Sequence, residues 1–237
     1  MSADSILGLD TATPDVAVAV TRSAETVAEV QVAPNGRPRH ATELLPRIEA
    51  AVAEAGGWDV IGAIGVGIGP GSFTGLRIGI ATARGLGQGL SRPLRPVGTL
   101  DALARGIATR PGGGGRRTLP VLDARRGQVF AALHEPGGEA AWEPFVATPE
   151  QLAERVASLP EAPLTGGDGS LRFRQDLEAA GAEVLPEADP GHRLSARHTA
   201  ELADGLPDAA PGEIRPVYLR PPDAQLWIER DRGPLGG

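Results

Sequence analysis

A short pattern occurs twice in this sequence, and it constrains the fold more than any other feature. An apolar run that ends in Asp10 is followed by a turn and a strand of alternating valine and alanine. A second apolar run ends in Asp123, and a turn and another strand with small residues follow it. Four consecutive glycines, residues 112–115, lie just before the second copy and can hold regular structure only at a large entropic cost. The sequence therefore predicts two duplicated lobes joined by a glycine-rich linker.

This linker sets the predicted domain boundaries. We expect a first lobe at residues 1–109, the linker at 110–117 and a second, smaller lobe at 118–222. Residues 223–237 are polar, with Gly and Pro at the end, and are expected to form a mobile tail.

Hydrophobic spacing in the first lobe predicts the element order β-β-β-α-β-α-β-α, the pattern of a ribonuclease-H-like half-domain. Thr42 and Thr99 are the expected N-caps of the first and third helices. With Thr42 as the cap, Pro46 falls in the first turn, where a backbone amide has no intrahelical acceptor to lose. The helices are expected at residues 42–55, 74–90 and 99–108.

The composition excludes several kinds of chemistry. All 23 basic residues are arginine, which rules out a phosphate-loop lysine and Schiff-base catalysis, and the absence of cysteine rules out disulfides, zinc thiolates and thiol nucleophiles. The four histidines show no spacing typical of a metal site. The sequence has no apolar run of 18 residues and no signal-peptide pattern at its start, so we expect a cytoplasmic protein without a membrane partner.

Charge is distributed unevenly along the chain. Residues 31–126 carry a net charge of +7 and residues 127–237 a net charge of −10, within a total of −7. A basic middle segment favours an anionic partner, although a coding bias toward arginine explains it equally well. The chain has only eight aromatic residues, which argues against an aromatic platform for single-stranded nucleic acid.

The glycine-rich segment Gly69–Gly79, with the sequence GPGSFTGLRIG, joins a buried strand to a helix. Such a turn can cradle a phosphate at the helix N-terminus. No lysine follows it, which excludes a Walker loop, and Pro70 and Thr74 occupy the positions where a nucleophile elbow requires glycine. The segment by itself favours a tight turn in which Ser72 or Thr74 caps the helix.

The helix that follows carries five glycines, which lower its intrinsic stability by about 4–5 kcal/mol relative to alanine. Close packing must offset this cost. Gly75, Gly79, Ala83 and Gly87 recur every four residues and form a ridge that another element can approach closely. That element is either the chain's own sheet or a partner subunit.

Asp10 and Asp123 each follow an apolar run and precede a turn. Paired acids at strand ends bind the magnesium and phosphates of a nucleotide in many ATPases. The alternative is that each aspartate caps its own turn. The turn cap is favoured for Asp123, whereas the two readings are equally supported for Asp10, which is followed by Thr11 and Thr13.

Several segments together resemble the TsaB (YeaZ) family. The resemblance follows the family's order over the first two thirds of the chain, is highly specific in the GPGSFTGLRIG segment, and is loose beyond about residue 150. The matching segments are residues 6–13, 40–46, 69–79, 122–125 and 129–130, with 165–170 and 216–220 as weaker reference points.

The resemblance implies a two-lobed actin/Hsp70-like ATPase fold with a reduced second lobe. It also implies a role in the bacterial machinery that makes threonylcarbamoyladenosine at position 37 of tRNA. The catalytic subunit of that machinery, TsaD, holds a metal through a His-x-x-x-His motif, which this chain lacks. The resemblance thus implies a non-catalytic subunit that pairs with TsaD and TsaE, forms a homodimer when alone and contacts tRNA only within the complex. Nothing in the sequence supports glycoprotease chemistry.

The resemblance also assigns site residues. No catalytic residue and no metal ligand is expected, and ATP or ADP with magnesium, if used, is expected at the complex interface rather than tightly bound. A small ATPase or kinase of the actin/Hsp70 superfamily is the alternative function, and a module that binds tRNA directly is a third. The candidate nucleotide-binding residues are Asp10, Thr11, Thr13 and Asp123. The expected partner-interface residues are His40, Leu44, Ile48, Ser72, Phe73, Thr74, Gly75, Leu76, Arg77, Gly79, Ile80, Ala83 and Gly87.

Overall fold

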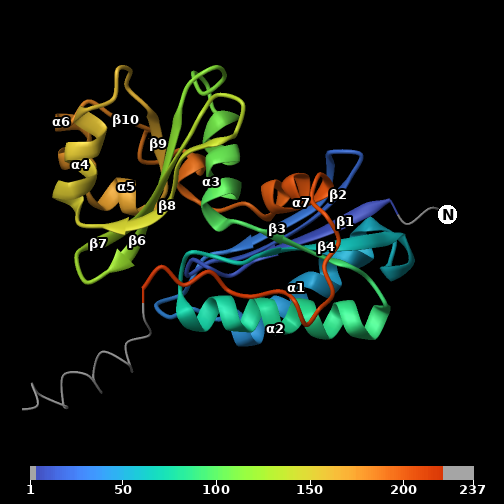
Figure 1. Ribbon diagram of the computed structural model, residues 1–237. Coiled ribbons are helices and arrows are strands. Elements are labelled where there is room, and N and C mark those ends of the chain that lie inside the picture. The colour runs from blue at the N-terminus through green and yellow to red at the C-terminus, as the bar shows by residue number, and fades with distance from the viewer. Residues whose placement is uncertain (1–3, 221–237) are drawn as a thin grey trace, which may run out of the picture.

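The computed structural model describes residues 4–220 and contains two five-stranded sheets, one in each lobe (Figure 1). In the first sheet the strand order is β3-β2-β1-β4-β5. The first three strands pair antiparallel, and β4 and β5 continue the sheet in parallel. These strands are β1 (Ser5–Asp10), β2 (Val16–Arg22), β3 (Glu25–Val32), β4 (Ile61–Gly67) and β5 (Leu94–Val97).

The second sheet repeats this topology. Its order is β8-β7-β6-β9-β10, again with an antiparallel meander followed by two parallel strands. Each strand of the first sheet therefore has a counterpart in the second, and the predicted duplication is confirmed. The strands are β6 (Thr118–Arg125), β7 (Gln128–His134), β8 (Ala140–Ala147), β9 (Leu164–Gly166) and β10 (Glu183–Val184).

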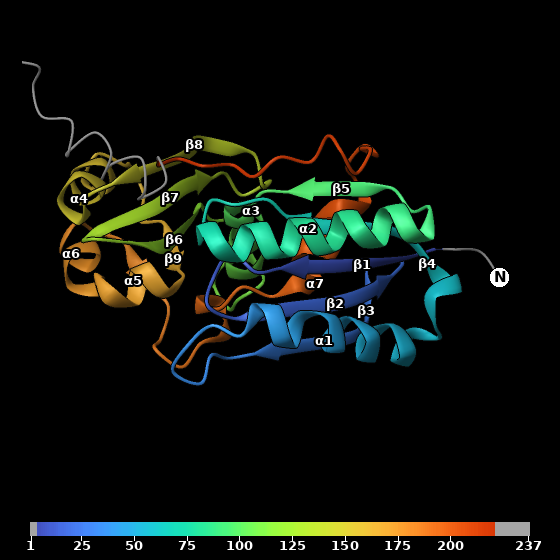
Figure 2. The ribbon, with the colours of Figure 1, turned by 90° about the horizontal axis from the view of Figure 1, so that it is seen from below.

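Helices cover both faces of each sheet. In the first lobe α1 (His40–Ala55) and α2 (Phe73–Leu90) lie side by side on one face (Figure 2). The core between them and the sheet includes Leu7, Leu9 and Ile48, because alternate residues of β1 point to that face. The remaining helices are α3 (Thr99–Ala108), α4 (Pro149–Ala157), α5 (Asp168–Arg172), α6 (Arg174–Ala179) and α7 (Ala196–Asp204).

Two of the predicted N-caps, Thr42 and Thr99, are wrong. Helix α1 begins at His40, because the His40 Nε2 donates to the carbonyls of Thr13 at 2.9 Å and Asp15 at 3.1 Å and so fixes the first turn. Pro46 therefore lies in the second turn, on the exposed side of the helix. Thr99 is the first residue of α3 rather than its cap, and its hydroxyl is used elsewhere. Of the two residues predicted as the cap of α2, Ser72 is the cap and Thr74 lies inside the helix.

The two lobes exchange helices. Helix α3 follows the first sheet in the chain but packs on β6 of the second sheet, and α7 follows the second sheet but packs on β1, β2 and β4 of the first. The second lobe is predicted to extend over residues 118–222, but α7 and the chain as far as Val217 pack on the first lobe, whereas Arg220 donates to Gln128 of β7 in the second. The predicted tail at 223–237 lies outside the described residues.

Helix α7 approaches the first sheet closely because that face carries small residues. A Cβ at Gly8 of β1 would collide with the Ala196 carbonyl and lie 2.8 Å from the Ala200 nitrogen, both backbone atoms of α7. A Cβ at Gly65 of β4 would lie 2.7 Å from the Ala203 side chain. Ala17 and Ala19, which alternate with the valines of β2, pack against Ala196.

The segment after α7, residues 206–220, runs along the edge of the first lobe beside α2, and we call it the C-terminal strap (Figure 2). Leu94 and Ala209 exchange two backbone hydrogen bonds, and Arg84 of α2 donates to the carbonyl of Ile214. The Val217 N–H donates to the Ile68 carbonyl at 2.8 Å. Among residues 4–220, no helix combines the length and apolar character that crossing a bilayer requires.

We predict that Gly8→Ala lowers the free energy of unfolding by about 1–3 kcal/mol, because the added methyl group meets backbone atoms of α7 that cannot move independently. Urea denaturation measures this change. Gly137→Ala is the matched control, since a Cβ at Gly137 has open space around it, and it should shift stability by no more than about 0.5 kcal/mol. Equal stabilities of the two variants would contradict the close fit of α7.

Candidate functional site

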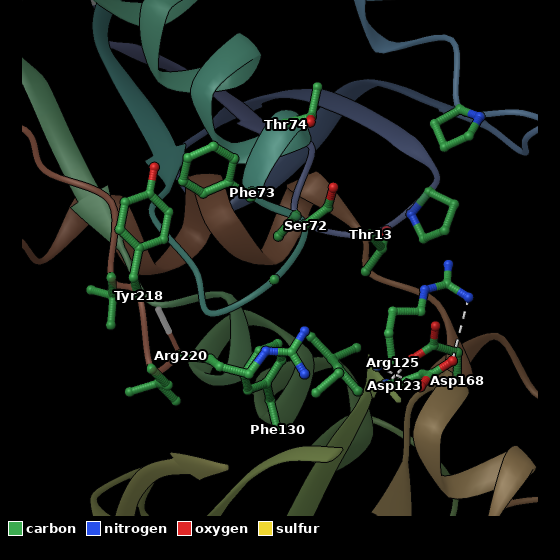
Figure 3. Close-up of a pocket in the computed structure, with 18 residues that line it drawn as sticks. Thr13, Ser72, Phe73, Thr74, Asp123, Arg125, Phe130, Asp168, Tyr218 and Arg220 are labelled. Atoms are coloured by element: carbon green, nitrogen blue, oxygen red, sulfur yellow. Dashed lines mark hydrogen bonds and ion pairs between the residues drawn. The ribbon is translucent and has the colours of Figure 1, made fainter. Parts of the chain in front are cut away.

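A cleft of about 480 Å³ lies between the lobes (Figure 3). The turn after β1 and the first turn of α2 supply one wall, and the end of β6 supplies the other, with the C-terminal strap across one end. Of the four candidate nucleotide-binding residues, Thr13 and Asp123 line the cleft, whereas Asp10 and Thr11 do not. The labelled lining residues are Thr13, Ser72, Phe73, Thr74, Asp123, Arg125, Phe130, Asp168, Tyr218 and Arg220.

Asp10 is buried inside the first lobe. Its Oδ1 accepts the backbone N–H of Ala12 at 2.7 Å, and its Oδ2 accepts the hydroxyl of Thr99 at 2.9 Å. A Cβ at Gly67 would collide with the carboxylate, so this glycine is what gives Asp10 its space. Burial raises the pKa of Asp10 to about 6, and the hydrogen bonds offset only part of that effect. Asp10 thus caps its own turn and joins β1 to the start of α3.

Thr11 connects β1 to α2. Its hydroxyl donates to the Gly75 carbonyl at 2.8 Å. A Cβ at Gly75 would collide with the Thr11 carbonyl, and one at Gly79 with the Thr11 hydroxyl. A Cβ at Gly87 would lie 2.8 Å from Leu94 of β5. The glycine ridge of α2 therefore packs on the chain's own sheet, which decides between the two alternatives that the sequence left open.

Asp123 faces the cleft, but its carboxylate already has partners. Oδ1 accepts the backbone N–H of Arg125 at 2.8 Å, the same turn contact that Asp10 makes. Oδ2 is paired with the guanidinium of Arg172 at 2.8 Å and with that of Arg125 at 3.4 Å. The neighbouring Asp168 accepts the Asp123 N–H at 2.9 Å, and burial, strengthened by the Asp123 charge, raises the pKa of Asp168.

The predicted pairing of Asp10 with Asp123 around a nucleotide's magnesium is therefore not assembled. One carboxylate is enclosed in the first lobe, and the other is neutralised by two arginines of the second. Within residues 4–220, no group of three or more His, Asp or Glu side chains is arranged to hold a metal ion. The favoured reading of Asp123 as a turn cap is confirmed.

Aromatic side chains gather at the cleft. Phe73, Phe130 and Tyr218 line it, which is three of the eight aromatic residues of the whole chain. Tyr218 comes from the C-terminal strap, 145 positions away from Phe73. In the sequence, residues 216–220 are only a weak reference point for the resemblance. No local pattern there signals a contact with α2, so the sequence does not predict this grouping.

Most of the predicted partner-interface residues are buried, where they help to hold α1 and α2 on the sheet. Their contact with a partner stays a prediction. Ser72, Thr74 and Arg77 are exposed and Phe73 is half-buried, so these four remain available to a partner. The buried residues are His40, Leu44, Ile48, Gly75, Leu76, Gly79, Ile80, Ala83 and Gly87.

Comparison with known proteins shows which proteins this chain is similar to. A family model described as TsaD, tRNA N6-adenosine threonylcarbamoyltransferase, matches residues 30–163. An Escherichia coli protein named tRNA threonylcarbamoyladenosine biosynthesis protein TsaB is 34% identical over 226 residues, which cover 91% of this chain and 94% of that protein.

Solved structures agree with the sequence comparison. YeaZ from Pseudomonas aeruginosa superposes with a TM-score of 0.75 at 26% identity and covers 92% of this chain and all of that one. A ROK hexokinase from Thermus thermophilus, at 17% identity and a TM-score of 0.52 over 85% of this chain, shares the fold alone. The predicted two-lobed, actin/Hsp70-like α/β fold is confirmed.

The buried carboxylate predicts a pH-dependent stability. The pKa of Asp10 rises from 3.8 to about 6 on folding, so the folded protein keeps this proton to a higher pH than the unfolded chain does. The free energy of unfolding should therefore fall between about pH 4 and pH 6 and stay lowered above that range. Asp10→Asn should remove this loss and raise stability at pH 7 by as much as about 3 kcal/mol.

Denaturant unfolding measures the free energy of unfolding at pH 4.5, below the pKa of Asp10 in the folded protein, and at pH 7, above it. The difference between the two values should be smaller for Asp10→Asn than for the parent. Asp59→Asn, on an exposed aspartate, is the control and should leave the pH dependence unchanged. An Asp10→Asn variant that is less stable than the parent at pH 7 would show that the ionised carboxylate stabilises the fold.

Proposed function

The chain belongs to the TsaB (YeaZ) family, and on this premise we propose that it is a non-catalytic subunit of the machinery that forms threonylcarbamoyladenosine in tRNA. In this proposal it pairs with the TsaD-type catalytic subunit, TsaE joins the pair, and the chain forms a homodimer when alone. Its contacts with tRNA occur only within the complex.

The observation that carries the non-catalytic assignment is the state of the two strand-end acids. Asp10 is enclosed and hydrogen-bonded, and Asp123 is held by Arg125 and Arg172. Neither carboxylate is free to bind magnesium at the phosphates of a nucleotide, which is what the alternative of a free-standing ATPase or kinase requires. We therefore place any ATP or ADP of the complex at the boundary with the partner subunit, which supplies the missing ligands.

The outer face of α1 and α2 supports the pairing. Leu45 of α1 is 50% exposed, the largest exposure of any large hydrophobic residue among those described. Two of the five glycines in α2, Gly85 and Gly89, face open space, so the fold itself does not require them. Their cost in helix stability, about 1 kcal/mol each, fits a surface against which another helix packs closely.

We predict that Gly85→Arg prevents pairing with the TsaD-type subunit while leaving the fold intact. The new side chain meets no atom of the chain itself, and replacing a helical glycine should raise stability by about 0.5–1 kcal/mol. Co-expression with the TsaD homologue of the same genome, followed by affinity purification and size-exclusion chromatography, measures the pairing.

The control is Gly137→Arg, which adds the same side chain at an open position in the second lobe. It should pair as the parent does. Normal pairing of Gly85→Arg would show that the outer face of α2 is not the contact surface, and a parent chain that does not pair with TsaD would contradict the proposed function itself.

A further inference from the structure

The first turn of α2 and the C-terminal strap form a compact aromatic cluster at one end of the cleft (Figure 3). The rings of Phe73 and Tyr218 lie 5.1 Å apart between centroids, with an interplanar angle of 33°. The Arg77 guanidinium lies 3.8 Å from the centroid of the Phe73 ring, and its Nε donates to the Tyr218 hydroxyl at 3.2 Å. The three side chains therefore hold one another in place.

Arg77, Val217 and Tyr218 are exposed beside α2. Tyr218 is 38% and Val217 is 37% exposed, and with Leu45 these are the exposed large hydrophobic residues of the part of the chain that the structure describes. The strap passes along one side of α2 while α1 lies along the other (Figure 2). The strap thus adds two exposed apolar side chains beside α2.

The strap is fixed before any partner arrives. The Val217 N–H is bonded to the Ile68 carbonyl at 2.8 Å, and Arg84 of α2 binds the Ile214 carbonyl. Gly69 leaves room for the chain here, since a Cβ at that position would lie 2.9 Å from the Val217 carbonyl. A side chain that is already ordered loses little entropy when it is buried at an interface.

The charge of the cluster indicates what the partner must offer. Arg77 is exposed and forms no ion pair with any acid among residues 4–220. By contrast, Arg39 and Arg47 of α1 are both paired with Glu43. A guanidinium that stacks on a ring and has no ion-pair partner among the described residues can present its outer nitrogens to a carboxylate of a partner.

We propose that Val217 and Tyr218 of the strap, together with Phe73 and Arg77, form the anchor of the partner surface and receive a segment of the TsaD-type subunit in which a carboxylate lies beside an apolar side chain. This rests on the proposed pairing and extends the contact surface beyond α1 and α2. Tyrosine and arginine are the residue types that most often dominate the binding energy of such surfaces.

Affinity for purified TsaD homologue, measured by biolayer interferometry on the full chain, tests the anchor. Tyr218→Ala and Arg77→Gln should each weaken binding about 10- to 30-fold. Tyr218→Phe keeps the ring and should stay within about threefold of the parent, since it loses only the hydrogen bond to Arg77. Binding of the parent should weaken as salt rises, and Arg77→Gln should show a shallower salt dependence because the proposed ion pair is gone.

The second lobe supplies a matched control. Arg155 stacks on Trp142 and Phe145, at 4.5 and 4.0 Å from the ring centroids, and so forms a similar cluster away from α2. Arg155→Gln should leave the affinity unchanged while altering the melting temperature about as much as Arg77→Gln does.

Unchanged affinity in Tyr218→Ala and Arg77→Gln, with the parent binding TsaD, would overturn the anchor and leave the proposed function standing. Loss of self-association without loss of TsaD binding would also overturn it, since the surface would then serve a second copy of this chain. A parent chain that fails to bind TsaD at all would remove the proposed function and the anchor together.

Discussion

The fit of α7 against the glycines of the first sheet determines how the two lobes are combined. Gly8 and Gly65 leave the space that the helix occupies. The short side chains of the β2 alanines let α7 pack closely on the rest of that face. Because α7 comes after the second sheet in the chain, this fit carries the C-terminal segment back across the molecule. The strap then reaches α2. The cleft and the proposed partner surface therefore both depend on the packing of α7 on the first sheet.

The duplication places the same aspartate turn in both lobes, but in different surroundings. Asp10 and Asp123 occupy equivalent strands, and each accepts the N–H of the residue two positions on. The first is then buried against the start of α3, whereas the second meets two arginines at the cleft. The turn geometry is retained in both lobes, but one carboxylate is enclosed and hydrogen-bonded while the other is ion-paired with Arg125 and Arg172.

Local patterns in the sequence predicted the duplicated lobes, the order of the elements along the first half and a cap at Ser72 or Thr74, because turns, caps and hydrophobic periods involve neighbouring residues. They could not decide what the glycine ridge of α2 packs against, since a ridge that fits the chain's own sheet looks the same as one that fits a partner. Gly75 and Gly79 turned out to face Thr11, whereas Gly85 faces outward. The return of α7 and the contact of Tyr218 with Phe73 have no local signal, because each depends on residues more than a hundred positions apart.

The most direct test of the account is a reconstituted reaction that contains the TsaD and TsaE homologues, a source of threonylcarbamoyl-adenylate and unmodified tRNA, with and without this chain. Mass spectrometry of the digested nucleosides measures threonylcarbamoyladenosine. We predict that the modified nucleoside forms only when this chain is present, and that the chain without TsaD forms none. Equal product in the absence of this chain, or product from this chain without TsaD, would contradict the proposed role of a non-catalytic and required subunit.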